Sequence, residues 1–84
     1  MQIAVDISLY PLNSDYVPAI KEFIERIALH DGLSLEYNSL STQLRGEFDA
    51  VFAALKAEIA ATYGGPERAV FVLKMVGGAE SHST

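Results

Sequence analysis

The order in which hydrophobic periodicity changes along the chain constrains its fold most strongly. Residues 2–10 alternate between apolar and polar positions, as in a strand with two unlike faces. Residues 16–30 place apolar side chains at helical spacing, with charged residues on the opposite side. Residues 33–38 and 42–47 are predicted as two short strands, a second helical pattern begins at Phe48, and residues 69–76 form an apolar strand. The predicted order is therefore strand, helix, strand, strand, helix, strand.

Turn and capping residues separate these elements. Pro11 is expected to end the first strand, because proline cannot donate to a sheet ladder. Residues 13–15 offer N-cap side chains for the first helix, and Gly32 after Asp31 is expected to mark its end. The short polar segment 38–41 predicts a hairpin, and the Gly-Gly-Pro sequence at 64–66 predicts the end of the second helix.

This order in a chain of 84 residues predicts one ferredoxin-like α+β sandwich, with an antiparallel four-stranded sheet and two helices on one face. Residues 1–78 are expected to form this domain, and residues 79–84 a frayed polar tail. In this topology the first and last strands are antiparallel neighbours. The hypothesis from register is that Asp6 and Lys74 lie opposite each other on one face; if the last strand has the opposite phase, they do not meet.

The sheet face without helices is predicted to be unusually apolar. The chain is 50% hydrophobic with a mean hydropathy of +0.20, which is rich for so small a domain. Such a face is expected to be covered by a ligand, by a partner subunit or by both. Its predicted residues are Ala4, Asp6, Ser8, Tyr10, Val70, Val72 and Val76.

Composition excludes several classes of function. A net charge of -5 and only six scattered basic residues argue against a nucleic-acid partner. No cysteine is present, so disulfides and thiolate chemistry are excluded. No segment resembles a signal peptide or a membrane span, and a cytoplasmic location is expected. His30 and His82 lack carboxylates at ligand spacing, so neither a metal site nor a cofactor is predicted. No activated nucleophile or phosphate-binding loop occurs, so no catalytic residue is predicted.

The densest polar cluster lies in and around the predicted hairpin. Amide and hydroxyl groups both donate and accept hydrogen bonds, which suits a neutral heterocycle with mixed hydrogen-bonding edges. The alternative is that these side chains only stabilise a tight turn by bonding their own backbone. The cluster comprises Tyr37, Asn38, Ser39, Ser41 and Thr42, with Ser8 and Tyr10 on the first strand.

Two carboxylates and several tyrosines could accommodate a cationic group. Asp6 and Glu47 would attract the positive charge, and Tyr10, Tyr16 or Tyr37 could stack on it. Alternatively, Asp6 pairs with Lys74 across the strands, and Glu47 is a favourable charge at the start of the second helix.

The sequence resembles the YkoF-like thiamine-binding family from residue 3 to about residue 76. The resemblance is carried by residues 5–12 (VDISLYPL), residues 37–42 (YNSLST), Gly46-Glu47, Val51-Phe52 and Lys74. The chain departs from the family pattern at Leu40, where methionine is usual. It also ends soon after the last strand, where relatives often continue.

The resemblance implies a ferredoxin-like fold that assembles through its sheets into homodimers or homotetramers. It also implies binding of thiamine or its hydroxymethylpyrimidine moiety, without catalysis. Asn38, Ser8, Ser41 and Thr42 would then meet the aminopyrimidine, and Asp6 or Glu47 with a tyrosine would accommodate the thiazolium. The alternative is a regulatory or interaction module of the same fold without thiamine affinity. An enzyme of the acylphosphatase type would need an arginine in an anion-binding loop after the first strand, and residues 11–14 contain none.

Overall fold

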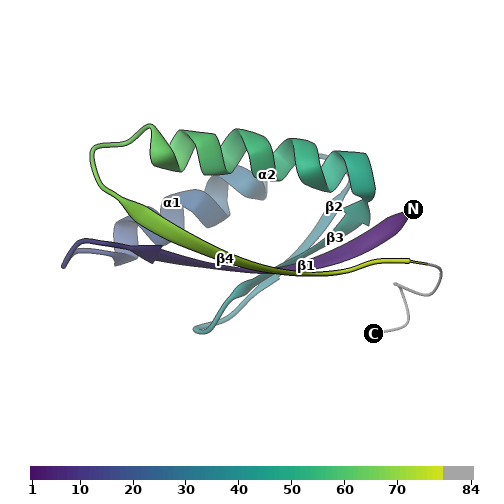
Figure 1. Cartoon of the computed structure of the whole chain (residues 1–84), viewed down its shortest axis with the longest axis horizontal. Helices are drawn as coiled ribbons and strands as arrows, with labels where there is room; N and C mark the ends of the chain where they lie inside the picture. The colour runs from purple at the N-terminus through teal and green to yellow at the C-terminus, as the bar shows by residue number, and fades with distance from the viewer. Residues whose placement is uncertain (79–84) are drawn as a thin grey trace.

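The structure, a computed structural model, describes residues 1–78, and the predicted tail at 79–84 lies outside them. Its elements follow the predicted order (Figure 1). They are β1 (Gln2–Pro11), α1 (Val17–Ile27), β2 (Leu33–Tyr37), β3 (Thr42–Glu47), α2 (Phe48–Tyr63) and β4 (Ala69–Val76). Within the described residues, no helix is both long and apolar enough for a membrane crossing.

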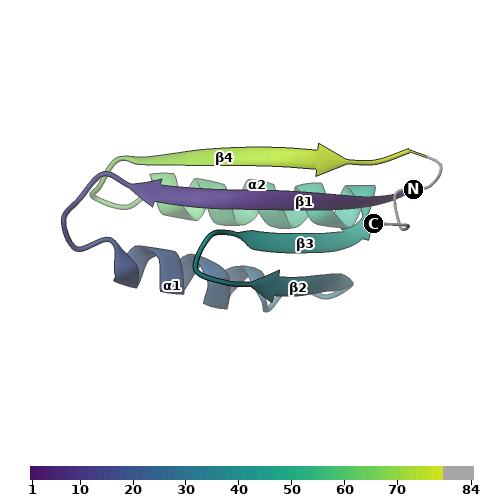
Figure 2. The ribbon, with the colours of Figure 1, turned by 90° about the horizontal axis from the view of Figure 1, so that it is seen from below.

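The four strands form one antiparallel sheet in the order β2-β3-β1-β4, with both helices on one face (Figure 2). The prediction of a ferredoxin-like βαββαβ sandwich is therefore confirmed. The central strand β1 pairs with β3 from Gln2 to Ile7 and with β4 from Ala4 to Pro11. These two pairings are offset, and the offset positions the candidate site described below.

The core lies between the sheet and the helices. Alternate residues of β1 point into it, because successive side chains of a strand point to opposite faces. Each large apolar side chain buried in this way contributes about 1.5–3 kcal/mol to folding. The buried apolar residues are Ile3, Val5, Ile7, Phe23, Ile27, Leu44, Val51, Ala54 and Leu55.

Two predicted boundaries of α1 need correction. Helix α1 ends at Ile27, well before the expected stop, and Gly32 instead adopts a positive φ of 81° in the turn that leads into β2. The N-cap of α1 is Tyr16 without a side-chain cap, because the Asn13 Oδ1 accepts a hydrogen bond from the Asp15 N–H at 2.7 Å. The expectation that Pro11 ends β1 is confirmed: it is the last residue of the strand and lies opposite Ala69 on β4.

The helix-free face carries the residues expected from the strand pattern. Asp6 lies opposite Lys74 on β4, which confirms the predicted register. The two side chains do not form an ion pair among residues 1–78; the Asp6 Oδ1 accepts a hydrogen bond from the Ser41 hydroxyl at 2.5 Å. Val70, Val72 and Val76 are each nearly half exposed on this face, so the predicted apolar surface is present on the single chain.

Candidate functional site

A difference in strand length opens a cavity beside β1. Strand β3 pairs with β1 only as far as the pair Ile7 and Thr42, whereas β1 continues along β4 to Pro11. The β2–β3 hairpin turns away from β1 beyond this point and lies on the side of the sheet opposite the helices (Figure 1). The cavity between β1, the hairpin and α1 has a volume of about 380 Å³.

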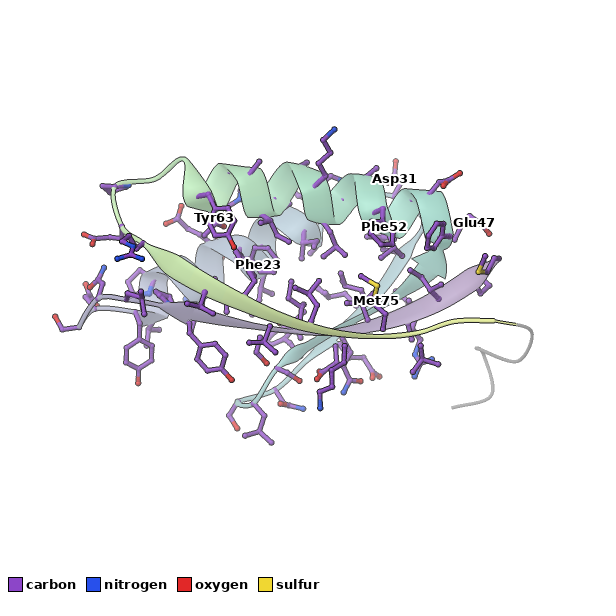
Figure 3. All side chains as sticks on the ribbon, viewed as in Figure 1. Phe23, Asp31, Glu47, Phe52, Tyr63 and Met75 are labelled. Carbon is purple, nitrogen blue, oxygen red and sulfur yellow. The ribbon has the colours of Figure 1, made fainter. Side chains whose placement is uncertain are left out.

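The cavity has an apolar floor and a polar rim. The floor is formed by Ile7, Leu9, Ile20, Phe23 and Ile24, and Figure 3 shows Phe23 between the helices and the sheet. The rim carries hydroxyl, amide and phenol groups, from Ser8, Tyr10, Tyr16, Asn38, Ser39, Ser41 and Thr42, and is completed by Pro11 and Leu40. None of these lining residues is charged, which suits a small neutral ligand with a few polar atoms.

Asn38 presents mainly a hydrogen-bond donor to a ligand. Its Oδ1 accepts hydrogen bonds from the backbone N–H of Leu40 at 2.8 Å and of Ser41 at 3.2 Å. This is the turn-stabilising role expected of an asparagine in a tight hairpin. Among residues 1–78 the Nδ2 group has no hydrogen-bond partner, so the structural role and a binding role are compatible in the same side chain.

Ser41 and Ser8, in contrast to Asn38, present hydrogen-bond acceptors to a ligand. The Ser41 hydroxyl donates to the Asp6 Oδ1 at 2.5 Å, and its remaining lone pairs can therefore accept from a ligand. The Ser8 hydroxyl donates a long hydrogen bond of 3.5 Å to the Leu40 carbonyl oxygen and is likewise left with free lone pairs. The rim thus places an acceptor side chain near the donor of Asn38.

The backbone of Leu9 adds a donor and an acceptor. The Leu12 N–H donates to the Arg68 carbonyl oxygen at 2.9 Å, so the even-numbered residues of β1 direct their backbone groups toward β4. By strand alternation, the odd-numbered residues face β3. The last pair of β1 with β3 is Ile7 with Thr42, and Leu9 is the next odd-numbered residue of β1. Within the described residues, the N–H and C=O of Leu9 have no partner on the hairpin. Leu9 is one of the residues that line the cavity.

The structure brings most of the predicted site residues together. Ser8, Tyr10, Asn38, Ser39, Ser41 and Thr42 all line the cavity, and Asp6 contacts it through Ser41. Tyr37 does not line the cavity, although it immediately precedes Asn38. Glu47 lies at the other end of β3, where both carboxylate oxygens bind the amino group of Met1 at 2.9 Å (Figure 3). The two predicted residues Tyr37 and Glu47 are therefore separate from the other seven.

Other cavity residues were not among the predicted site residues. The sequence suggests Tyr16 only as a stacking group, and Ile20 and Ile24 are part of the apolar helical spacing over residues 16–30. The helical spacing of Ile20 and Ile24 predicts that both side chains are buried. It does not show that this part of the helix lies over a cavity. That depends on where β3 stops relative to β1, which sequence periodicity leaves open.

A second cavity of about 400 Å³ lies between the β1–α1 connection and the α2–β4 connection. Its lining contains charges of both signs, among them Asp15, Glu22, Arg26, Glu67 and Arg68. Arg26 is already engaged, because its Nε donates to Glu58 at 2.9 Å and its NH2 group donates to the Thr62 hydroxyl at 2.8 Å. Because its lining carries charges of both signs and Arg26 is already hydrogen-bonded, this second cavity is a weaker candidate for a ligand site than the uncharged cavity.

The cluster around Glu58 connects the two helices. His30 Nε2 lies 2.7 Å from Glu58 Oε2, so folding gives this histidine a carboxylate partner that sequence spacing did not reveal. The hydrogen bond with His30, and then that with Arg26, lowers the pKa of Glu58 below its ordinary value, although burial opposes the shift. Within residues 1–78 no group of three or more His, Cys, Asp or Glu side chains that could hold a metal ion occurs.

Fold and cavity together define a small α+β sandwich with a cavity between a central strand, a hairpin and a helix. The model of the YKOF-related family matches residues 2–65, and the chain belongs to that family. No curated protein matches the chain.

Solved structures share the fold over nearly the whole chain. A hypothetical protein from Methanocaldococcus jannascii is 25% identical, with a TM-score of 0.81 over 94% of this chain and 82% of that one. A Thermotoga maritima protein, described as a candidate thiamine biosynthesis/salvage protein, is 22% identical, with a TM-score of 0.80 over 93% of this chain and 85% of that one. A Streptococcus pneumoniae protein is 18% identical, with a TM-score of 0.85 over 95% and 90%.

Proposed function

We propose that this protein binds thiamine or its hydroxymethylpyrimidine moiety, without catalysis, in the cavity between β1, α1 and the β2–β3 hairpin. One observation carries the proposal: an uncharged cavity with an apolar floor presents donor and acceptor groups side by side on its rim. Membership of the YKOF-related family and the thiamine-related description of the Thermotoga maritima protein point in the same direction.

The polarity of the rim matches an aminopyrimidine. The Asn38 Nδ2 would donate to a ring nitrogen, and the Ser41 hydroxyl or the Leu9 carbonyl would accept from the exocyclic amino group. Tyr10 and Tyr16, both on the rim, would flank the ring. The apolar floor would cover the ring methyl group, so each part of the pyrimidine has a counterpart in the lining.

The thiazolium part carries a positive charge that the cavity itself does not neutralise. Tyrosine faces attract such a cation, and the Asp6 carboxylate lies just behind Ser41. The cavity lining contains no lysine or arginine that could hold a phosphate group. We therefore expect thiamine to bind more tightly than its phosphorylated forms.

We propose binding rather than catalysis because the lining consists of apolar groups, amides, hydroxyls and phenols. A reaction on a neutral heterocycle would need an activated nucleophile or a positioned acid and base. We further propose that the protein acts in the cytoplasm as a homodimer or homotetramer, since a partner copy would cover the apolar sheet face.

The sharpest test replaces Asn38 with aspartate. Asn38→Asp keeps an oxygen that accepts from Leu40 and Ser41, but it removes the Nδ2 donor. Isothermal titration with hydroxymethylpyrimidine should show saturable binding by the wild type and an affinity about tenfold or more lower in the variant. Asn13→Asp is the matched control, because Asn13 forms a similar turn outside this cavity.

A second candidate is an interaction module whose helix-free face serves only assembly. The half-exposed valines of β4 favour it, because they need cover whether or not the cavity is occupied. The absence of heat and of thermal stabilisation with millimolar thiamine and hydroxymethylpyrimidine would contradict the first proposal and support this one. Equal affinity of the Asn38→Asp and Asn13→Asp variants would contradict the assignment of the site.

A further inference from the structure

Two polar side chains on the rim of the cavity belong to one tight turn. The Asn38 Oδ1 accepts hydrogen bonds from the backbone N–H groups of Leu40 and Ser41. The Asn38 N–H in turn donates to the Ser41 carbonyl oxygen at 3.1 Å. Both residues line the cavity, and these hydrogen bonds hold them close together on its rim.

The turn fixes which group Asn38 presents to the cavity. An amide side chain can in general turn over and exchange its donor for its acceptor. A reversed Asn38 would direct its Nδ2 at two backbone N–H donors and would leave both of them without an acceptor. Because such unsatisfied groups are costly, the amide keeps its orientation and presents only a donor to a ligand.

Asp6 fixes the Ser41 hydroxyl in the opposite sense. A free hydroxyl rotates and can either donate or accept, but this one donates to the Asp6 Oδ1 at 2.5 Å. An ionised carboxylate only accepts, and O–H···O⁻ bonds of this length are among the strong hydrogen bonds. Lys74 lies opposite Asp6 but, within residues 1–78, forms no ion pair with it. The Ser41 proton therefore stays on the Asp6 side, and only lone pairs remain for a ligand.

We propose that Asp6 is a positioning residue that makes this site select 4-aminopyrimidines over 4-oxopyrimidines, by holding the Ser41 hydroxyl as an acceptor. Asp6 acts through Ser41 and is not itself among the residues that line the cavity. The inference rests on the proposed function, and it adds to that function the class of pyrimidine that the site admits and the residue that decides it.

The two classes of pyrimidine present opposite hydrogen-bonding edges. In a 4-aminopyrimidine the adjacent ring nitrogen accepts and the exocyclic amino group donates. In the 4-oxo form that ring nitrogen carries a proton and donates, whereas the carbonyl oxygen accepts. The amino form therefore matches the donor of Asn38 and the acceptor of Ser41, and the oxo form opposes donor to donor and acceptor to acceptor. Since neither side chain can reverse, the oxo form loses both hydrogen bonds.

Asp6→Asn tests the proposal with little change of shape. An amide at this position can donate to the Ser41 oxygen as well as accept from it, so the hydroxyl becomes free to donate to a ligand carbonyl. The probes are hydroxymethylpyrimidine and its 4-oxo analogue, which are both uncharged, so the lost charge of Asp6 does not itself change their attraction to the site. Glu36→Gln is the matched control, because Glu36 is an exposed carboxylate on the same sheet face and does not line the cavity.

Isothermal titration gives the ratio of the two dissociation constants for each protein. The wild type should bind the amino form about a hundredfold more tightly than the oxo form, with about tenfold from each mismatched contact. Asp6→Asn should reduce this ratio to about tenfold, because Asn38 alone still discriminates, and Glu36→Gln should keep the wild-type ratio. A merely structural role of Asp6 would weaken the binding of both ligands equally and leave the ratio unchanged. Ser41→Ala, which leaves Asp6 in place, should weaken only the binding of the amino form, by about tenfold.

Circular dichroism verifies that each variant is folded. A ratio for Asp6→Asn equal to that of Glu36→Gln would overturn the proposal and would assign recognition of the amino group to the Leu9 carbonyl. Equal weakening of both ligands by Ser41→Ala would also overturn it. Saturable binding of both pyrimidines with equal affinity by the wild type would contradict this inference alone and leave the proposed function standing. Absence of binding by either pyrimidine would contradict the proposed function and this inference with it.

Discussion

The two ends of strand β3 lie in contrasting environments. At Gly46 the chain has no room for even a methyl group, because an added Cβ would lie 2.8 Å from the Gly32 carbonyl oxygen and 2.9 Å from a Leu33 methyl carbon. At Thr42, four residues earlier, the same strand borders a cavity of about 380 Å³. The tight end makes the fold specific, and the open end leaves volume that a ligand can use.

Helix α1 repeats this contrast. In its C-terminal part Arg26, followed after the helix by His30, is held by the Glu58 carboxylate of α2. In its N-terminal part Tyr16 and Ile20 face the cavity. Both elements are thus fixed at one end and line the candidate site at the other, which allows a small domain to combine a rigid core with a pocket.

The largest effect is expected at the tight end. Gly46→Ala would force the backbone at Gly32 to shift and should lower the free energy of unfolding by about 2–3 kcal/mol, in the range of other overpacked substitutions. Gly64→Ala is the matched control, since its nearest atom would be 3.4 Å away and its φ of -77° suits alanine. Urea unfolding followed by circular dichroism measures both. Equal stability of the two variants would contradict the account of Gly46.

A smaller effect is expected where α1 is tied to α2. Glu58 is 14% exposed, and Glu58→Gln should lower the free energy of unfolding near neutral pH by about 1–2 kcal/mol. Because the folded pKa of Glu58 lies below its unfolded value of about 4.5, its contribution is complete above that pH. It is lost as pH falls through the folded pKa.

The wild type and the Glu58→Gln variant should therefore converge in stability as pH falls below about 4.5, measured by urea unfolding at several pH values. Glu25→Gln removes a charge from the exposed side of α1 and should leave the stability nearly unchanged. A gap between wild type and Glu58→Gln that stayed constant down to low pH would show that the carboxylate charge is not what stabilises this contact.

Local patterns were sufficient to predict much of the fold. The periodicity predicted the order of elements, and the structure confirms the hypothesis that Asp6 lies opposite Lys74, which the sequence left dependent on the phase of β4. Contacts between distant segments were not predictable in the same way. The pair of His30 with Glu58 spans 28 positions, and nothing local to either residue signals it.

The candidate site shows the same limit. The hairpin polar residues were identified because they are adjacent in sequence, and six of the predicted site residues line the cavity. Glu47 is separated from them because β3 runs the length of the sheet between Thr42 and this carboxylate. The position of the cavity depends on the offset between the β1–β3 and β1–β4 pairings, which is a tertiary property.

The smallest predicted effect is a difference in ligand affinity between variants of Tyr16 and of Tyr37. Tyr16 lines the cavity and Tyr37 does not, although both are more than half exposed. Tyr16→Ala removes one aromatic face and should weaken thiamine binding about three- to tenfold, the usual range for an exposed cation–π contact or stacking contact. Tyr37→Ala should leave the affinity unchanged. Calorimetric titration of both variants compares them directly. A larger loss for Tyr37 would mean that the ligand binds on the outer side of the hairpin rather than between the hairpin and α1.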